Sequence, residues 1–468
     1  IMHLMVLLVY KMFTTSKEGI MKKKFIILLF AILMATAGGA AALCACSDGD
    51  TATLGAPKNF MISDEFFILW DKVDGAERYV LEIDGVQYET EDNCFEMQEM
   101  IDNVHPVNVK VKAIAPSTKN NSDWVEYTYE QPTAALKYNL LDDGSGYAVK
   151  KANDSSYVRG LEGRVVIPDY YNGLPVTQIA EEAFGEEQYE GFNPEYGINC
   201  NNKTTSVRMP HFLKHIGKDA FYACVALKDI DLPSNLSDVT IGMRAFEHCY
   251  ALESIDLSYA TELGSYAFYS CKSLKNIILP DDPPLIDIWV FHYTAWYNSQ
   301  PQDQPIVLDG DILYEYNGRP EDGIYQIPEG IKAISGGAFV VTKITRLIIP
   351  DGVTLLGTEM FYPSKIEEVV LPSDLKSIPD STFRNCKELR QVCVYGEEQN
   401  AKDGYFILPD TLTSIGEWAF NGCSADTVVI PNKDITIKGR GLPYTLNKVI
   451  WCGQEIDGET FKDMFNIY

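Results

Sequence analysis

The sequence predicts a mainly β protein, in which a solenoid of about ten coils, each 22–25 residues long with one parallel strand, follows a small antiparallel β-sandwich. One observation is a recurring segment that closes on a phenylalanine. Phe221, Phe246, Phe268 and Phe291 are separated by 25, 22 and 23 residues, and a fixed period of this length is typical of solenoids. The other observation is a block of short alternating strands with turn residues between them, ahead of the repeats.

Each repeat has the internal order of a coil that turns back on itself. In the copy at 226–249, Ile230 and Leu232 lie two residues apart and therefore on one face of a strand. Pro233 then ends the strand, because proline has no N–H to donate to a ladder. One such coil cannot bury its own apolar face, whereas stacked coils can. The repeats therefore predict a parallel stack.

The repeats resemble the BspA-like leucine-rich repeats of bacterial surface proteins. The shared pattern is L-x-x-I-x-L-P-x-x-L-x-x-I-G-x-x-A-F-x-x-C, and it recurs over residues 140–455. The resemblance implies a leucine-rich repeat domain at 133–459 with an opening cap at 140–154. Phe461, Met464 and Phe465 have helical spacing, so residues 460–468 are expected to cap the other end.

Three interruptions of the period are expected. Residues 185–203 are polar and rich in Gly and Asn, which predicts a loop. The 48 residues from Phe291 to Phe339 span about two periods and predict an irregular double coil. A shorter insertion at 395–404 delays the coil that ends at Phe420.

Residues 56–132 predict an antiparallel sandwich. Alternating apolar residues occupy 68–70, 79–83, 107–113 and 125–129, with Asp-Gly turns after the first two runs. The segment W-D-x-V-x-G-A-x-x-Y-x-L-x-I resembles a fibronectin type III domain, although the family usually has tyrosine where this chain has Val107. The resemblance implies a spacer, with a direct binding role as the alternative.

Residues 1–46 are expected to be upstream residues and a lipoprotein signal peptide. From Met21, a basic segment precedes a short apolar run, which is the pattern of a secretory signal. The segment Leu43-Cys44-Ala45-Cys46 resembles a bacterial lipobox and implies lipidation of Cys46; the alternative is cleavage and secretion. Residues 47–55 would then be a tether, with the acyl chains holding the membrane. Acidic residues after Cys46 resemble an export tag, which implies the outer membrane or cell surface of a Gram-negative bacterium.

Charge and motifs exclude several function classes. The chain has 39 basic and 66 acidic residues, a net charge of −27, whereas nucleic-acid binding requires a basic surface. No G-x-S-x-G, P-loop, G-x-G-x-x-G or C-x-x-C motif occurs. His211 and His215 lie four residues apart without the Glu of a metalloprotease helix. An enzyme, a cofactor and a metal are therefore not expected.

Five cysteines lie three residues after a repeat phenylalanine, so stacking would place them in a column. They are Cys224, Cys249, Cys271, Cys386 and Cys423. In-register side chains of parallel coils point the same way rather than at each other. The pattern predicts reduced, buried thiols, with disulfides as the alternative for an exported protein.

The residue between the two inward positions of each predicted strand must face outward. Read down the stack, this outward column is charged at first and apolar later. Its members are Arg208, Asp231, Asp256, Ile278, Ile348, Val370, Cys393, Val429 and Ile450. An exposed apolar stripe often marks an interface. The alternatives are that β-branched residues simply favour strands, or that a loop covers them.

An aromatic run offers a second candidate site. Trp289, Tyr293, Trp296 and Tyr297, with Phe291 and His292 between them, could form a platform on which a sugar stacks. The alternative is that the run fills the irregular coil.

Two functions follow from these observations. The first is a non-catalytic cell-surface binding or adhesion lipoprotein that recognises a protein or glycan on host or neighbouring cells through the exposed strand face. The second is a glycan-capture component of a surface carbohydrate-utilisation system. Exposure of Trp289 and Trp296 would favour the second.

Overall fold

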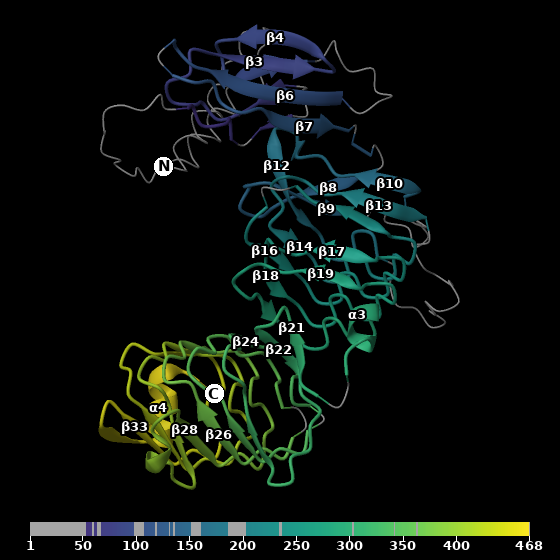
Figure 1. Cartoon of the computed structure of the whole chain (residues 1–468). Coiled ribbons are helices and arrows are strands. Elements are labelled where there is room, and N and C mark those ends of the chain that lie inside the picture. Colours follow the sequence, from purple (N-terminus) through teal and green to yellow (C-terminus); the bar gives the residue numbers. More distant parts are fainter. Residues whose placement is uncertain are drawn as a thin grey trace. The chain divides into compact units, whose positions relative to one another are not determined.

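The computed structural model describes residues 53–467, except 59, 63–66, 98–106, 118, 131, 134–135, 151–160, 186–202, 234–235, 302–303, 341 and 362–363. The predicted signal segment and most of the insertion at 185–203 lie outside the described residues. The chain divides into two compact units, residues 1–131 and 132–468 (Figure 1).

The first unit contains two antiparallel sheets around one core. In sheet order, the strands are β1 (Met61–Ile62), β2 (Phe67–Leu69) and β5 (Cys94–Glu96), and then β4 (Val86–Thr90), β3 (Arg78–Ile83), β6 (Val107–Ile114) and β7 (Val125–Tyr129). Ile68 of one sheet and Leu81 and Val109 of the other are fully buried in the same cluster. Asp84 and Gly85 both have positive φ, as the two-residue turn between β3 and β4 requires. The predicted antiparallel sandwich is confirmed.

The second unit is a solenoid whose coils pair in parallel. Its first half has two rows of strands. One row contains β10 (Gly163–Val166), β13 (Thr204–Arg208) and β15 (Asp229–Asp231), followed by β17 (Ser254–Asp256) and β19 (Asn276–Ile278). The other row contains β8 (Lys137–Leu140), β9 (Tyr147–Lys150), β12 (Leu174–Ile179), β14 (His215–Ile216), β16 (Val239–Ile241), β18 (Ala260–Leu263) and β20 (Leu285–Ile286), with β11 (Tyr170–Tyr171) beside β12. The antiparallel β8–β9 pair stands at the start of this row, where its first strand lies ahead of the opening cap predicted at 140–154.

The second half of the solenoid has one long sheet, which we call the front sheet. Its strands are β23 (Ile324–Gln326), β25 (Arg346–Ile348), β26 (Glu368–Leu371), β28 (Gln391–Val394), β29 (Tyr405–Ile407), β31 (Thr427–Ile430), β33 (Lys448–Trp451) and β34 (Gln454–Asp457). A shorter sheet contains β27 (Ser377–Ile378), β30 (Ser414–Ile415) and β32 (Thr436–Ile437). Helix α4 (Gly458–Phe465) closes the end with Phe461 buried, while Met464 of the predicted apolar set is exposed.

The irregular coil lies between the two halves, where the sequence predicts it. It contains α3 (Ala295–Asn298), the antiparallel pair β21 (Ile306–Leu308) and β22 (Ile312–Glu315), and β24 (Ala333–Ile334), which pairs with β22 in parallel. The solenoid core is in two clusters that meet here.

The repeat phenylalanines form a stacked ladder in the core. Phe221, Phe246 and Phe268 have successive ring centroids 5.0 and 5.1 Å apart. In the irregular coil the ladder is continued by tyrosines, with Tyr314 beside Phe291 and Tyr316 beside Phe339. This spacing is close to the ~4.8 Å between neighbouring strands, so ring stacking and strand pairing have a common period.

The repeat cysteines lie beside this ladder as buried free thiols. The Cys249 thiol donates to the Phe221 carbonyl oxygen at 3.3 Å, and the Cys271 thiol donates to that of Phe246 at 3.1 Å. Each bond joins one coil to the preceding coil. The prediction that these cysteines are buried is confirmed, and the hydrogen bond gives a reason for a cysteine three residues after the phenylalanine.

Candidate functional site

The outward column is continuous in the front sheet. Strand register aligns Ile348 with Val370, Val370 with Cys393, and Val429 with Ile450. Ile407 aligns with Val429 on the other side and therefore belongs to the same column. The apolar column thus crosses β25, β26, β28, β29, β31 and β33 without a gap.

The accessibility of this column varies along the sheet. Ile348, Ile407, Val429 and Ile450 are half-buried, whereas Val370 and Cys393 are only 1% and 2% exposed. The 3-10 helix η3 (Glu398–Asn400) contacts β28, and the charges of Arg346, Glu398 and Glu368 all act on the Cys393 thiol. The expectation that Val370 and Cys393 face solvent is therefore wrong.

A polar column flanks the apolar column on the same face. Two residues before Ile348 and Val370, Arg346 and Glu368 form an ion pair of 3.3 Å across neighbouring strands. Farther along the sheet, Lys448 pairs with a glutamate of β34 at 3.0 Å. The face thus combines an apolar centre with a charged border.

In the first half of the solenoid, the outward column is interrupted and polar. Asp256 aligns with Ile278, which is 56% exposed. Asp231 is exposed and pairs with Arg164 at 2.7 Å.

Arg208 is a correction to the predicted column, because it is buried. Its guanidinium donates to both carboxylate oxygens of Asp169, at 3.0 and 3.2 Å. Burial opposes ionisation of Asp169, but the charge of Arg208 and a hydrogen bond from His211 hold its pKa well below the usual range. Arg208 therefore joins neighbouring coils and is unavailable to a partner.

Ile407 is not among the residues of the predicted column, although the sequence contains a signal for it. The segment Phe406-Ile407-Leu408-Pro409 has the strand-then-proline order of the other repeats. It comes only 14 residues after Val392, its partner in β28, so the 22-residue period hides it.

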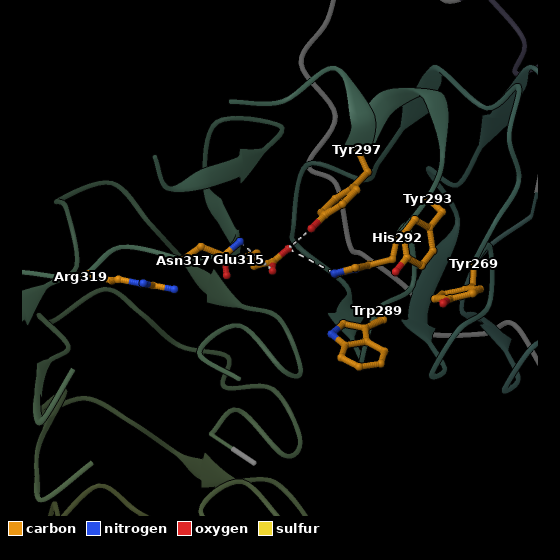
Figure 2. A pocket seen from close by; sticks show the side chains of 8 residues that line it. All are labelled: Tyr269, Trp289, His292, Tyr293, Tyr297, Glu315, Asn317 and Arg319. Atoms are coloured by element: carbon orange, nitrogen blue, oxygen red, sulfur yellow. Dashed lines mark hydrogen bonds and ion pairs between the residues drawn. The ribbon is translucent and has the colours of Figure 1, made fainter. Parts of the chain in front are cut away.

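The second candidate site is a hollow of about 380 Å³, which we call the aromatic hollow. It is lined by Tyr269, Trp289, His292, Tyr293, Tyr297, Glu315, Asn317 and Arg319 (Figure 2). Three of the four residues of the predicted platform therefore line one site. Trp296 does not, because its ring packs against the core beside Phe291 and Tyr314.

The floor of the aromatic hollow is a buried carboxylate held by three donors. Tyr297 Oη donates to Glu315 Oε2 at 2.7 Å, His292 Nε2 lies 3.2 Å from the same oxygen, and Asn317 Nδ2 donates to Oε1 at 2.9 Å. Burial works to raise the pKa of Glu315, but these hydrogen bonds and His292 hold it below the usual range. The floor is therefore ionised and rigid.

Above this floor, the aromatic side chains are open to solvent to different degrees. Tyr293 is 53% exposed, and Trp289 and Tyr269 are half-buried. Figure 2 shows these rings on one side of the hollow and Arg319 on the other, with Glu315 between them. Arg319 is exposed.

The sequence matches a protein family described as the BspA type leucine rich repeat region. Six copies of the repeat match, over residues 196–300, 324–407 and 398–447. These coils are BspA-type leucine-rich repeats. No curated protein matches the chain.

Three crystal structures are similar to the chain. A leucine rich cell surface protein from Faecalibacterium prausnitzii is 22% identical, with 69% of this chain and 95% of that chain covered and a TM-score of 0.29. The pneumococcal vaccine antigen PcpA is 19% identical, with 70% of this chain and 88% of that chain covered and a TM-score of 0.29. A leucine-rich repeat protein from Bacteroides ovatus is 20% identical, with 69% of this chain and 90% of that chain covered and a TM-score of 0.29.

The histidines of the BspA-type repeats do not assemble a metal site. His211 contacts Asp169, whereas His215 lies in β14 with Nδ1 2.7 Å from Thr240 Oγ1. Within the described ranges, no group of His, Cys, Asp and Glu is arranged to hold a metal ion. Nor does any helix among these residues have the length and apolarity needed to cross a membrane. Cys46, the predicted lipidation site, lies outside the described residues.

Proposed function

We propose that this protein is a non-catalytic binding or adhesion protein that recognises a macromolecular partner through the front sheet of its BspA-type repeats. The observation that carries the proposal is the apolar column of the front sheet, in which Ile348, Ile407, Val429 and Ile450 are partly exposed and the buried Val370 and Cys393 lie between Ile348 and Ile407. Water contact with apolar side chains is unfavourable. A partner that covers the column therefore gains binding energy without any rearrangement of the sheet.

The charge of the chain favours a particular kind of partner. With a net charge of −27, the protein repels acidic surfaces and attracts basic ones. The charged border of the column would orient such a partner, while the apolar centre would supply most of the affinity. We therefore expect a protein partner with an apolar strip and a basic rim.

The N-terminal unit is proposed to be a fibronectin type III-like spacer. Its two sheets have the orders β1-β2-β5 and β4-β3-β6-β7, and Trp70 packs edge-on against Tyr79 in their common core. A three-plus-four division of strands supports an immunoglobulin-like sandwich of this kind. The role of a spacer is to hold the repeats away from the surface on which the protein is anchored.

The anchor is proposed to be a lipid on Cys46, which would place the protein at the outer membrane or cell surface of a Gram-negative bacterium. The support is the lipobox-like segment before Cys46 and the basic-then-apolar segment ahead of it. Metabolic labelling with an alkyne palmitate should label the intact protein but not the Cys46→Ser variant. Equal labelling of the two proteins would eliminate this anchor site.

The binding proposal is tested with the double variant Ile407→Asp/Val429→Asp. The two new aspartates would place carboxylates inside the interface with the partner. Affinity for a protein partner should fall at least about 100-fold, since each uncompensated charge costs several kcal/mol in an interface. The measurement is biolayer interferometry of the intact protein against fibronectin, laminin, fibrinogen and collagen. Val370 is unsuitable for this test, because an aspartate at that buried position would unfold the sheet.

A matched control adds the same charge to the shorter sheet in the same half of the solenoid. Ser377 and Thr436 are exposed on β27 and β32, so Ser377→Asp/Thr436→Asp should leave affinity unchanged. If both double variants bind the partner equally well, the front sheet is not the binding surface. Circular dichroism of both variants verifies that they are folded.

A further inference from the structure

We propose that the aromatic hollow is a saccharide-binding site, with preference for a sugar that carries a carboxylate. The inference goes beyond the binding of a protein by the front sheet and is independent of it. It depends on three features of the hollow: stacking surfaces that the fold does not require, unsatisfied polar groups, and a size suitable for a small ligand.

Two aromatic residues of the hollow, Trp289 and Tyr293, are not members of the buried core clusters of the solenoid. Trp289 and Tyr293 lie two residues before and after Phe291, outside the phenylalanine ladder. In the coil of Phe221 the same two positions contain Asp219 and Ala223. The coil geometry therefore accepts small and polar side chains at these positions.

The backbone at these two positions is set by the coil and not by the side chain. Trp289 and Tyr293 have φ values of 52° and 59°, and Asp219 and Ala223 at the same positions have 55° and 54°. The rings are therefore not selected by the backbone conformation.

The polar groups of the hollow define what the ligand must offer. Asn317 Oδ1 is buried and has no hydrogen-bond partner, so it requires a donor. Arg319 at the mouth is exposed and has no ion-pair partner among the described residues, so its guanidinium can donate to acceptors on a ligand. Glu315 already accepts three hydrogen bonds and acts mainly to fix Tyr297, His292 and Asn317.

A sugar ring satisfies all of these requirements together. Its C–H faces stack on aromatic rings, and its hydroxyl groups both donate to Asn317 and accept from Arg319. A carboxylate on the sugar would pair with the guanidinium in bidentate geometry. A purely apolar ligand would leave Asn317 and Arg319 desolvated without partners. The hollow volume of about 380 Å³ is within the range of small-ligand sites, about 300–1,000 Å³.

The test begins with a glycan array of neutral, sialylated and uronate-containing oligosaccharides, probed with the intact protein. The best oligosaccharide is then titrated calorimetrically against variants. Trp289→Ala and Tyr293→Ala should each weaken binding by about tenfold or more, because a stacking contact is lost. Arg319→Gln should weaken acidic sugars selectively and leave neutral sugars unchanged.

Trp418→Ala is the matched control. Trp418 occupies the same coil position two residues before a repeat phenylalanine, with φ of 63°, but it lies outside the hollow and stacks on Arg384. Its replacement should leave saccharide affinity unchanged, as should Ile407→Asp/Val429→Asp. Failure of the protein-binding proposal would therefore not affect this result.

The inference is overturned if no oligosaccharide class binds, or if Trp289→Ala and Tyr293→Ala bind as well as the unmodified protein does. It is also overturned if only peptides compete for the hollow. If Trp289→Ala does not fold, the affinity of Tyr293→Ala decides the same question.

Discussion

At the scale of single residues, Glu247 has the most unusual environment of the repeats. Its side chain lies between Arg244 and His248, with Oε1 3.3 Å from His248 Nε2, while the buried Oε2 has no hydrogen-bond partner. Burial raises the pKa of Glu247 to about 7; Arg244 partly opposes this effect and Asp219 adds to it. The folded protein therefore keeps a proton on Glu247 under conditions in which the unfolded chain releases it.

This raised pKa predicts a pH dependence with a definite sign. The stabilisation is fully present below the unfolded pKa of 4.5 and is lost as pH rises through about 7. Glu247→Gln should remove this dependence and stabilise the protein at pH 8 by about 1–2 kcal/mol, after allowance for partial solvent screening. Thermal unfolding between pH 5 and 8 measures the effect.

The control for this prediction is Glu388→Gln at an exposed position of the solenoid, which should leave the pH profile unchanged. A profile of Glu247→Gln parallel to that of the unmodified protein would contradict the assignment.

Single residues also show what the sequence could and could not predict. The repeat cysteines were predictable as buried thiols because their spacing is constant. Arg208 was not, because the outward direction of its side chain is changed by Asp169, which is 39 residues away in another coil. A pairing across coils leaves no local signal.

At the scale of the coil, the Ile-Gly step shows how closely neighbouring turns approach. Gly242 N donates to Ile216 O at 2.7 Å. A Cβ atom at Gly242 would lie 2.8 Å from the backbone nitrogen of Lys218, closer than neighbouring atoms tolerate. Glycine is therefore required there by the adjacent coil rather than by its own φ.

This contact predicts that Gly242→Ala destabilises the first half of the solenoid by about 1–3 kcal/mol, because the backbone must shift. Hydrogen exchange of the amides in β14 and β16 should accelerate.

Gly439→Ala is the matched control, since no atom lies within 4 Å of the added Cβ. It should be neutral or slightly stabilising. Equal stability of the two variants would mean that the coils are not in the tight register described above.

The coil scale also separates predictable from unpredictable architecture. The constant phenylalanine spacing predicts the parallel stack, and the irregular coil was visible as a doubled period. The polar side of the aromatic hollow was not predictable. Glu315, Asn317 and Arg319 come from the irregular coil, where no period relates them to Trp289, and only folding brings them together.

At the scale of the whole molecule, the two units have separate cores. The buried cluster of the first unit contains residues from Leu54 to Tyr129 only, and the solenoid clusters begin at Leu136. The β8–β9 pair covers one end of the second row of strands, where it pairs with β12. Such a cap protects an edge that would otherwise pair with other chains.

These separate cores predict that residues 132–468 fold without the first unit. Their unfolding temperature should be similar to that of the same residues in the intact protein. A shorter piece, 163–468, lacks the β8–β9 cap and should be less stable and prone to aggregation. Circular dichroism melting compares the stability of the pieces 132–468 and 163–468, and light scattering compares their aggregation. An unfolded 132–468 would show that the sandwich supplies part of the solenoid core.

The central claim is that the apolar column of the front sheet is the surface that a protein partner covers. Hydroxyl-radical footprinting with mass spectrometry measures the accessibility of these side chains directly, with and without the partner. We expect oxidation of Ile348, Ile407, Val429 and Ile450 to fall in the complex, while Tyr444, which is 63% exposed, remains oxidised. Unchanged oxidation of the column, with protection elsewhere on the solenoid, would contradict the claim.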